Sequence, residues 1–172
     1  MDDKKRNILF TEEQIQNRIK ELGKVITEDY KDKKLYVLPL LRGSFVFGAD
    51  IFRAIDCKAK VGFMTTSSYG HGEESTGEVK VVNDIPDNIE GLDVLIVDDI
   101  IDTGYTMEFV VNYVKERGAN SVKTCTLLDK PSRRKVNLSP DYCCFEIEDL
   151  FVVGYGLDYG SFYRNVPYVF NW

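Results

Sequence analysis

Apolar residues recur in the first part of the chain with the spacing of an amphipathic helix. Residues 11–14, Thr-Glu-Glu-Gln, have the form of a capping box, which marks the start of a helix. The apolar positions that follow are three or four residues apart, and they are Ile15, Ile19, Leu22 and Ile26. This pattern predicts a helix over residues 12–30 with one buried face.

Two further helices are predicted from the same kind of pattern. One runs from Phe45 to Ile55, and its predicted apolar face consists of Phe45, Ala49, Phe52 and Ile55. The other opens at Gly104 and stops at Gly118, where a glycine after basic residues is typical of a helix C-terminus.

Short apolar runs between the helices predict strands. Residues 35–40 and 94–97 are apolar without alternation, as in strands buried on both faces of a parallel sheet. Other predicted strands cover residues 60–67, 79–82, 122–128, 143–147 and 151–153. Strands that alternate with helices predict an α/β fold, with a mainly parallel twisted sheet flanked by helices.

Length and composition suit one domain that spans residues 1–172, since 44% of the residues are apolar. The polar stretch 68–78 contains glycines without apolar periodicity, so we expect a flexible loop there. No apolar run approaches the roughly 20 residues of a membrane span, and the charged N-terminus lacks the apolar segment of a secretion signal. We therefore expect a cytoplasmic protein with no membrane partner.

The four cysteines form no C-x-x-C pair, and a single histidine leaves no zinc-site spacing, which agrees with a reducing compartment. The net charge of −6 argues against a nucleic-acid partner, because such proteins usually present a basic face. One dense basic cluster stands out, formed by Lys130, Arg133, Arg134 and Lys135. An anionic small substrate is compatible with this charge if local amides or a metal hold it.

Ligands of parallel α/β sheets bind beyond the carboxyl ends of the strands, which are here the segments 41–44, 98–106 and 129–131. In the second of these, a buried strand leads into Asp98, Asp99 and Asp102, and then into a turn at a helix N-terminus. The free N–H groups of such a terminus favour a phosphate. Asp98 and Asp99 can accept hydrogen bonds from sugar hydroxyls or help to hold Mg²⁺. The segment therefore predicts a ribose-phosphate site.

A plainer alternative is an acidic loop in which Asp102 only caps the helix. Asp102-Thr103-Gly104 also matches the triplet of aspartic proteases, but those enzymes need two such aspartates on a β fold. The chain contains neither a P-loop nor a dinucleotide-binding fingerprint.

Residues 94–106 resemble the motif with which type I phosphoribosyltransferases bind 5-phosphoribosyl-1-pyrophosphate (PRPP). Four further segments resemble those of the hypoxanthine-guanine branch. Residues 40–44 resemble its pyrophosphate loop, and residues 67–70 resemble the start of its flexible catalytic loop. Residues 127–130 resemble the segment with its purine-contacting lysine, and residues 151–159, followed by 163–165, resemble its base-stacking and metal segment. The resemblance spans residues 8–170, and it implies that family's fold with a small hood built from the N-terminal and C-terminal segments.

The resemblance implies how PRPP is held. Asp98 and Asp99 are expected to contact the ribose hydroxyls, although the family often has the longer Glu at the first position. The residues expected to wrap the 5′-phosphate are Asp102, Thr103, Gly104, Tyr105 and Thr106.

The resemblance also implies a pyrophosphate subsite. Arg42, with Gly43, and Arg164 are expected to bind pyrophosphate, which suits a guanidinium fork. The peptide bond before Arg42 can be cis in this family. Ser68 and Tyr69 are expected to close over the reacting centre and exclude water.

The purine-binding roles fall on four further positions. Lys130 is expected to donate to the exocyclic O6, because an ammonium has only donors and so favours a 6-oxo over a 6-amino group. Phe151 is expected to stack on the base, unless it is a core aromatic. The backbone of Val152 and Asp158 is expected to read the other edge, and Asp102 is the expected catalytic proton acceptor at N7.

The implied reaction transfers a phosphoribosyl group from PRPP to N9 of a 6-oxopurine, and so gives IMP or GMP and pyrophosphate in purine salvage. The implied cofactor is Mg²⁺, for which the expected protein ligands are Asp98, Asp99 and Asp158. Relatives are commonly oligomers, so we expect a homodimer or homotetramer.

Two other functions stay open. The same chemistry on xanthine is not excluded by these residues, whereas Lys130 argues against adenine. The second open function is that of a regulator, which keeps the PRPP pocket but binds nucleic acid without turnover. The retained Asp102 and the net charge of −6 argue against this function.

Overall fold

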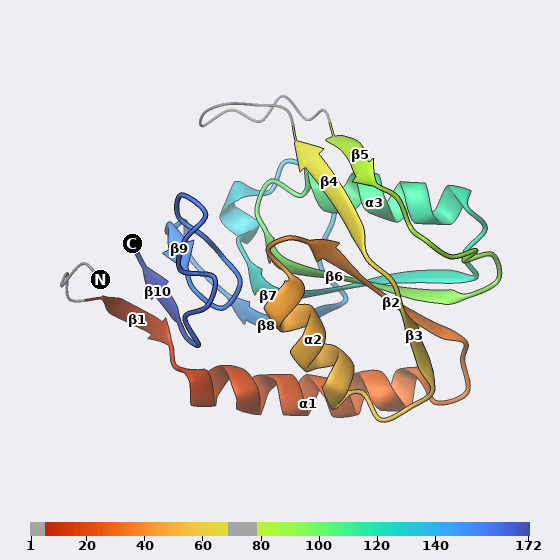
Figure 1. The fold of residues 1–172 in the computed structure, drawn as a ribbon, viewed down its shortest axis with the longest axis horizontal. Coiled ribbons are helices and arrows are strands. Elements are labelled where there is room, and N and C mark those ends of the chain that lie inside the picture. Colours follow the sequence, from red (N-terminus) through yellow and green to blue (C-terminus); the bar gives the residue numbers. More distant parts are fainter. Residues whose placement is uncertain (1–5, 69–78) are drawn as a thin grey trace.

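The computed structural model describes residues 6–68 and 79–172. Within them, the larger sheet has the order β5-β4-β2-β6-β7-β8, and β3 pairs with β2 (Figure 1). Every neighbouring pair is parallel except the antiparallel pair of β4 and β5. The predicted mainly parallel α/β architecture is therefore confirmed. The strands are β2 (Leu35–Leu41), β3 (Ala59–Val61), β4 (Met64–Ser68), β5 (Val79–Asn83), β6 (Asp93–Ile101), β7 (Ser121–Asp129) and β8 (Tyr142–Glu146).

Helices cover both faces of this sheet. Figure 1 shows α1 (Glu12–Tyr30) and α2 (Phe45–Ala54) on one face and α3 (Tyr105–Glu116) on the other. Along β2, Leu35 and Val37 belong to the apolar core under α1 and α2, whereas Tyr36 and Leu38 belong to the core under α3. Because alternate residues of a strand face opposite sides, burial on both faces explains why this strand is apolar throughout.

The start of α1 is set by local chemistry. The Thr11 hydroxyl accepts a hydrogen bond from the Gln14 amide at 3.2 Å, and the Gln14 side chain accepts one from the Thr11 amide at 2.9 Å. This capping box satisfies two of the N–H groups that have no partner within the helix. The predicted helix over residues 12–30 is confirmed at both ends.

The predicted apolar face of α2 is right at its end and wrong at its start. Ile55 is buried and Phe52 packs half-buried against the same core, whereas Phe45 is 46% exposed and Ala49 is exposed. The buried residues within the helix are Phe47, Gly48 and Ile51. Gly48 faces Pro39 of β2, where an added Cβ would lie 2.9 Å from a proline carbon. The helix is apolar on nearly every side, so spacing alone does not reveal which face meets the sheet.

The other apolar face of α2 lines an open hollow of about 470 Å³. Its exposed members include Phe45 of the helix and Val61 and Phe63 from the chain at and after β3. We call this surface the α2 patch, and it is lined by Pro39, Leu41, Phe45, Gly48, Ala49, Phe52, Arg53, Val61 and Phe63.

The single strand predicted at residues 60–67 is two strands, β3 and β4, both of which pair with β2. The interruption falls at Gly62, where an added Cβ would overlap the hydroxyl of Tyr36. The Gly62 amide donates to the carbonyl oxygen of Val37 at 3.1 Å, so the chain stays beside β2 across the break. The predicted flexible loop over residues 68–78 lies outside the described residues, apart from Ser68, which ends β4. Tyr69, which was predicted to close over the site with Ser68, therefore also lies outside the described residues.

A second, smaller sheet joins the two ends of the chain. It has the order β1-β10-β9 with antiparallel pairs, and its strands are β1 (Asn7–Phe10), β9 (Val152–Val153) and β10 (Val169–Asn171). Figure 1 shows this sheet beside the larger one, with β1 and β10 side by side. Among the described helices, none is both long and apolar enough to cross a bilayer.

Candidate functional site

Segments that follow β2, β6 and β7 meet at one edge of the larger sheet. The amide of Lys130, after β7, donates to the carbonyl oxygen of Ile101, at the end of β6, at 2.9 Å. Gly43, after β2, lies so close to Asp99 of β6 that an added Cβ would overlap the carboxylate. The three segments in which ligand contacts were expected therefore lie together.

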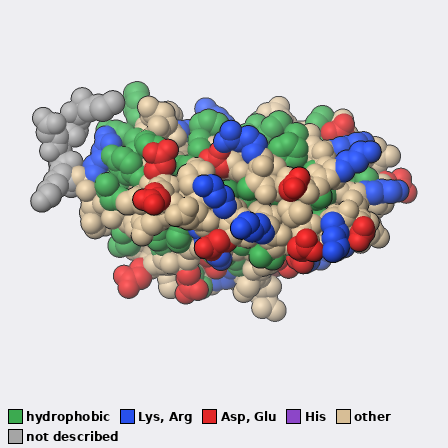
Figure 2. Space-filling model, turned by 90° about the horizontal axis from the view of Figure 1, so that it is seen from below, with side chains coloured by type: hydrophobic (Ala, Val, Ile, Leu, Met, Phe, Trp, Pro, Cys, Tyr) green, Lys and Arg blue, Asp and Glu red, His purple; other side chains and the backbone are tan. Residues whose placement is uncertain are grey.

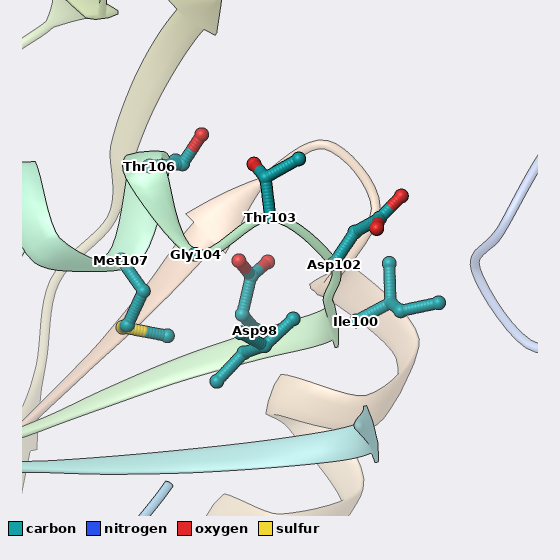
Figure 3. Close-up of a pocket in the computed structure, with 8 residues that line it drawn as sticks. Asp98, Ile100, Asp102, Thr103, Gly104, Thr106 and Met107 are labelled. Atoms are coloured by element: carbon teal, nitrogen blue, oxygen red, sulfur yellow. The ribbon is translucent and has the colours of Figure 1, made fainter. Parts of the chain in front are cut away.

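A pocket of about 120 Å³ lies between the end of β6 and the start of α3 (Figure 3). Gly104 is the N-cap of α3 with φ +89°, a conformation that glycine adopts without strain. The first N–H groups of α3 have no partner within the helix, so this end of the pocket suits an anion. The lining residues are Asp98, Ile100, Ile101, Asp102, Thr103, Gly104, Thr106 and Met107.

Four of the five residues predicted to wrap the phosphate line this pocket, and Tyr105, the first residue of α3, does not. The alternative in which Asp102 only caps the helix is wrong, because the N-cap is Gly104 and no side chain caps it. The Asp102 carboxylate instead accepts a hydrogen bond from Nε of Arg133 at 2.7 Å. Figure 3 shows the Asp98 carboxylate pointing toward the turn at Thr103 and Gly104.

Asp98 and Asp99 form a half-buried acidic doublet near the end of β6. Loss of water and then the charge of Asp99 raise the pKa of Asp98 well above its usual value. Loss of water also raises the pKa of Asp99, against hydrogen bonds and the nearby positive charge of Arg164. A ligand that brings hydrogen-bond donors or positive charge to the doublet is therefore favoured.

The doublet offers the oxygen ligands that Mg²⁺ prefers. Its raised pKa values reflect loss of water first and, at Asp98, also the charge of Asp99, and a bound cation would oppose both effects. Asp158, the third predicted ligand, pairs with Nη2 of Arg164 at 2.7 Å. Over residues 6–68 and 79–172, no three His, Cys, Asp or Glu side chains come together as a metal cluster. The doublet therefore fits Mg²⁺ by the chemistry of its oxygens, and Asp98 and Asp99 are the residues that would hold it.

Lys130 is 7% exposed, so it is not a solvated surface lysine. Its Nζ lies 3.7 Å from Oδ1 of Asp149, and the other oxygen of that carboxylate accepts a hydrogen bond from Nη1 of Arg133 at 3.4 Å. Since Arg133 also holds Asp102, four charged side chains are linked in a row. The charge of Asp102, followed by the hydrogen bond and charge of Asp149, raises the pKa of the Arg133 guanidinium.

On the other side of the loop that contains Gly43, the chain after β9 approaches closely. An added Cβ on Gly156 would overlap the carbonyl oxygen of Gly43, and Gly156 has φ +102°. Nη1 of Arg164 donates to the Gly156 carbonyl oxygen at 2.6 Å. Arg42 is exposed beside this contact, and the Leu41–Arg42 peptide bond is cis, as the resemblance implied was possible. Both arginines expected to bind pyrophosphate therefore border the same loop.

Phe151 is 55% exposed, so it is a surface ring and not a core aromatic. Its ring meets Tyr159 edge-on at 5.9 Å between centroids, and Tyr159 stacks on Trp172, the one tryptophan of the chain, at 4.5 Å. Val152, the next residue, is buried in β9. Phe151 therefore offers an exposed ring beside β9, at the edge of the smaller sheet.

Two residues of this site, Arg133 and Asp149, were not predicted. The sequence indicates Arg133 only as one of a basic cluster, and it predicts no role for Asp149. A usable signal was present, because Pro131 directly after Lys130 favours a tight turn that returns the next side chains to the strand ends. No local pattern indicates that Asp149, 19 positions after Lys130, closes the row.

Comparison with known proteins gives a family match over most of the chain. A family model described as a phosphoribosyl transferase domain matches residues 7–160. A Staphylococcus epidermidis protein named hypoxanthine-guanine phosphoribosyltransferase is 48% identical over 164 residues, which cover 95% of this chain and 92% of that protein. A Bacillus subtilis protein of the same name is 46% identical over 162 residues, covering 94% of this chain and 90% of the relative.

Solved structures agree with these relatives. A crystal structure of a hypoxanthine phosphoribosyltransferase from Staphylococcus aureus superposes with a TM-score of 0.93 at 46% identity, covering 96% of this chain and 90% of that one. A Bacillus anthracis hypoxanthine-guanine phosphoribosyltransferase also has a TM-score of 0.93, at 43% identity, covering 97% and 98% of the two chains.

Proposed function

The chain belongs to the phosphoribosyltransferase family, among the hypoxanthine-guanine phosphoribosyltransferases, and from this premise we propose that it transfers the phosphoribosyl group of PRPP to N9 of hypoxanthine or guanine. The products are IMP or GMP and pyrophosphate, as in purine salvage. One observation carries the proposal: the acidic doublet near the end of β6 is followed, after a short turn, by the N-terminus of α3, and a pocket lies between them. A ribose and its phosphate are ligands that suit these two neighbouring features.

The 5′-phosphate occupies the pocket in this proposal. The backbone N–H groups at the start of α3 and the hydroxyls of Thr103 and Thr106 donate to it, and Tyr105 contributes its amide. The ribose hydroxyls donate to Asp98 and Asp99. Both interactions place the sugar at the carboxyl end of β6.

The leaving pyrophosphate lies beside the loop that contains Gly43 in this proposal. Arg42 and Arg164, which border that loop, offer guanidinium donors to its phosphate oxygens. Mg²⁺, when bound at Asp98 and Asp99, supplies charge stabilisation for the departing pyrophosphate. Asp158 positions Arg164 through their ion pair at 2.7 Å. Ser68 and Tyr69 stay proposed closing residues, because the loop lies outside the described residues.

The purine is held by Lys130 and Phe151 in this proposal. The Lys130 ammonium donates to O6, and the exposed face of Phe151 stacks on the base. The backbone at Val152 and Asp158 contacts the opposite edge of the purine. Only a 6-oxo group gives the ammonium an acceptor, so the site favours hypoxanthine and guanine over adenine.

The transfer breaks the C1–O bond of PRPP, whose electron pair leaves with pyrophosphate, and forms a bond from C1 to N9. The Asp102 carboxylate is the catalytic group, and it accepts the proton from N7 of the purine. Positive charge grows on the ribose as the C1–O bond breaks, and the negative doublet beneath it stabilises that charge. The Asp102 carboxylate has to part from Arg133 to take this role, since Arg133 holds it at 2.7 Å.

A spectrophotometric assay with PRPP, Mg²⁺ and each of hypoxanthine, guanine, xanthine and adenine tests the proposed function. We expect nucleotide from hypoxanthine or guanine and none from adenine, because the Lys130 ammonium has no acceptor on a 6-amino group. A Lys130→Gln variant keeps a donor but loses the charge, so its KM for hypoxanthine should rise while its KM for PRPP stays near that of the native protein. Turnover of adenine, or of none of the four bases, would contradict the proposal.

A nucleic-acid-binding regulator receives no support. Figure 2 shows acidic and basic side chains interspersed over the face that it displays, in place of a continuous basic surface. Tight, salt-sensitive RNA binding without turnover would favour the regulator.

We also propose that the chain acts in the cytoplasm as one domain, with the smaller sheet as its hood, and as a homodimer or homotetramer. The α2 patch supports an oligomer, since contiguous exposed apolar side chains mark interaction surfaces more often than single ones do. Light scattering in solution distinguishes these assemblies from a 19.7 kDa monomer.

A further inference from the structure

We propose that Arg133 is a positioning residue for Asp102 and that Asp149 couples it to Lys130 through an exchange of ion pairs. In the free protein Arg133 holds Asp102 and Asp149 holds Lys130. A purine that takes the Lys130 ammonium leaves the Asp149 carboxylate to Arg133, and Arg133 then releases Asp102. The inference rests on the proposed function, because it assumes that Lys130 and Asp102 both meet the purine.

The row of contacts consists of one short contact and two long ones. Nε of Arg133 donates to Oδ1 of Asp102 at 2.7 Å, the length of a good charge-assisted hydrogen bond. Nη1 of Arg133 reaches Oδ2 of Asp149 at only 3.4 Å, and Nζ of Lys130 lies 3.7 Å from the other oxygen of that carboxylate. The Asp149 carboxylate thus makes long contacts with two cations, Lys130 and Arg133. When one of them binds another partner, the contact of Asp149 with the other becomes stronger.

The backbone that carries Lys130 and Arg133 is held in place, so the exchange needs only side-chain movement. The short 3-10 helix η1 (Pro131–Arg133) follows Lys130 directly. The Arg133 amide donates to the Lys130 carbonyl oxygen at 3.2 Å, and the Lys130 amide donates to the Ile101 carbonyl oxygen at 2.9 Å. The guanidinium therefore pivots from a fixed base between Asp102 and Asp149.

Burial separates Arg133 from its neighbour Arg134. The Arg134 side chain is 11% exposed, pairs with Asp129 and donates to the Asp102 carbonyl oxygen at 3.1 Å, so it supports the fold of the loop. The side chains of Arg133, Asp102 and Asp149 are 37%, 40% and 54% exposed. Ion pairs at such exposure are screened by water and weak, which lets them exchange partners when a ligand arrives.

Two substitutions are expected to act in different ways. Arg133→Gln removes the group that occupies Asp102 in the free protein, so the competent form is more populated and the KM for hypoxanthine falls roughly two- to fivefold, the range of an exposed ion pair. Asp149→Asn removes the alternative partner of Arg133, so Asp102 stays held. The kcat of Asp149→Asn is therefore expected to fall roughly two- to fivefold, which is again the range of an exposed ion pair, and its KM for hypoxanthine is not expected to rise.

The double variant supplies the decisive comparison. If Asp149 acts through Arg133, then adding Asp149→Asn to Arg133→Gln leaves kcat at the value of Arg133→Gln alone. Arg133→Lys restores a charge near Asp102 and is expected to return the KM toward that of the native protein. A kcat loss from Asp149→Asn of the same size in both backgrounds, or a raised KM for hypoxanthine in Arg133→Gln, would overturn the proposal.

A matched control pair lies away from the site. Arg117 pairs with Asp84 at side-chain exposures of 39% and 45%, close to those of Arg133 and Asp102. Arg117→Gln therefore removes an equally exposed pair, and it should change neither kinetic constant. The native protein is assayed beside the variants, so absent turnover there overturns the proposed function, whereas native turnover with an additive cycle overturns the exchange alone.

Discussion

Asp102→Asn is expected to lower kcat by roughly 10²–10⁴-fold, the usual contribution of a positioned acid–base group. The amide has nearly the shape of the carboxylate but does not accept the proton at N7. Steady-state kinetics with hypoxanthine and PRPP measure the effect, and the KM for PRPP should change far less than kcat because the backbone of the phosphate pocket is kept.

Asp84→Asn is the control for Asp102→Asn, because Asp84 is also an exposed carboxylate paired with an arginine. It removes a charge of the same kind far from the pocket and should leave kcat unchanged. Undiminished turnover of Asp102→Asn would exclude Asp102 as the proton acceptor.

Gly43→Ala is expected to lower kcat/KM for PRPP by about 10²-fold, the scale on which a displacement of about 1 Å affects catalysis. A Cβ at this position overlaps the Asp99 carboxylate, so either the doublet or the loop after β2 has to move. On the side away from Asp99, the loop contacts Gly156. The Gly43 carbonyl oxygen lies there in the space that a Cβ on residue 156 would occupy. The methyl group therefore disturbs the proposed ribose and pyrophosphate contacts together.

Gly91→Ala separates this effect from a general loss of stability. Gly91 has φ +71°, so alanine is strained there, but an added Cβ meets no atom within 4 Å. We expect a lower melting temperature for Gly91→Ala with an unchanged KM for PRPP. If Gly43→Ala has native kcat/KM for PRPP, the contact between Gly43 and Asp99 does not organise the site.

The features that local sequence determines were predictable. The capping box at Thr11 and Gln14 fixes the start of α1, and both bounds of that helix match the prediction. The segment 98–106 was also recognisable, because strand, acidic doublet, glycine turn and helix follow one another without interruption. Each of these features rests on contacts between residues a few positions apart.

Features that depend on distant contacts were not predictable. The buried face of α2 is set by the fit of Gly48 against Pro39, and the break between β3 and β4 by Gly62 against Tyr36. The pairing of β1 with β10 joins opposite ends of the chain, and only the family resemblance, through the hood it implies, pointed to contact between those ends. The same holds in the site, where Arg133 reaches Asp102 across 31 positions and no short pattern records that meeting.

The central claim is that the end of β6 holds a ribose 5-phosphate between the acidic doublet and the start of α3. A crystal structure of the protein with bound IMP tests it most directly. The account predicts the phosphate within hydrogen-bonding distance of the amides of residues 103–106, the ribose hydroxyls at Asp98 and Asp99, and O6 at Lys130. IMP bound elsewhere on the molecule, or with its phosphate outside that pocket, would contradict the account.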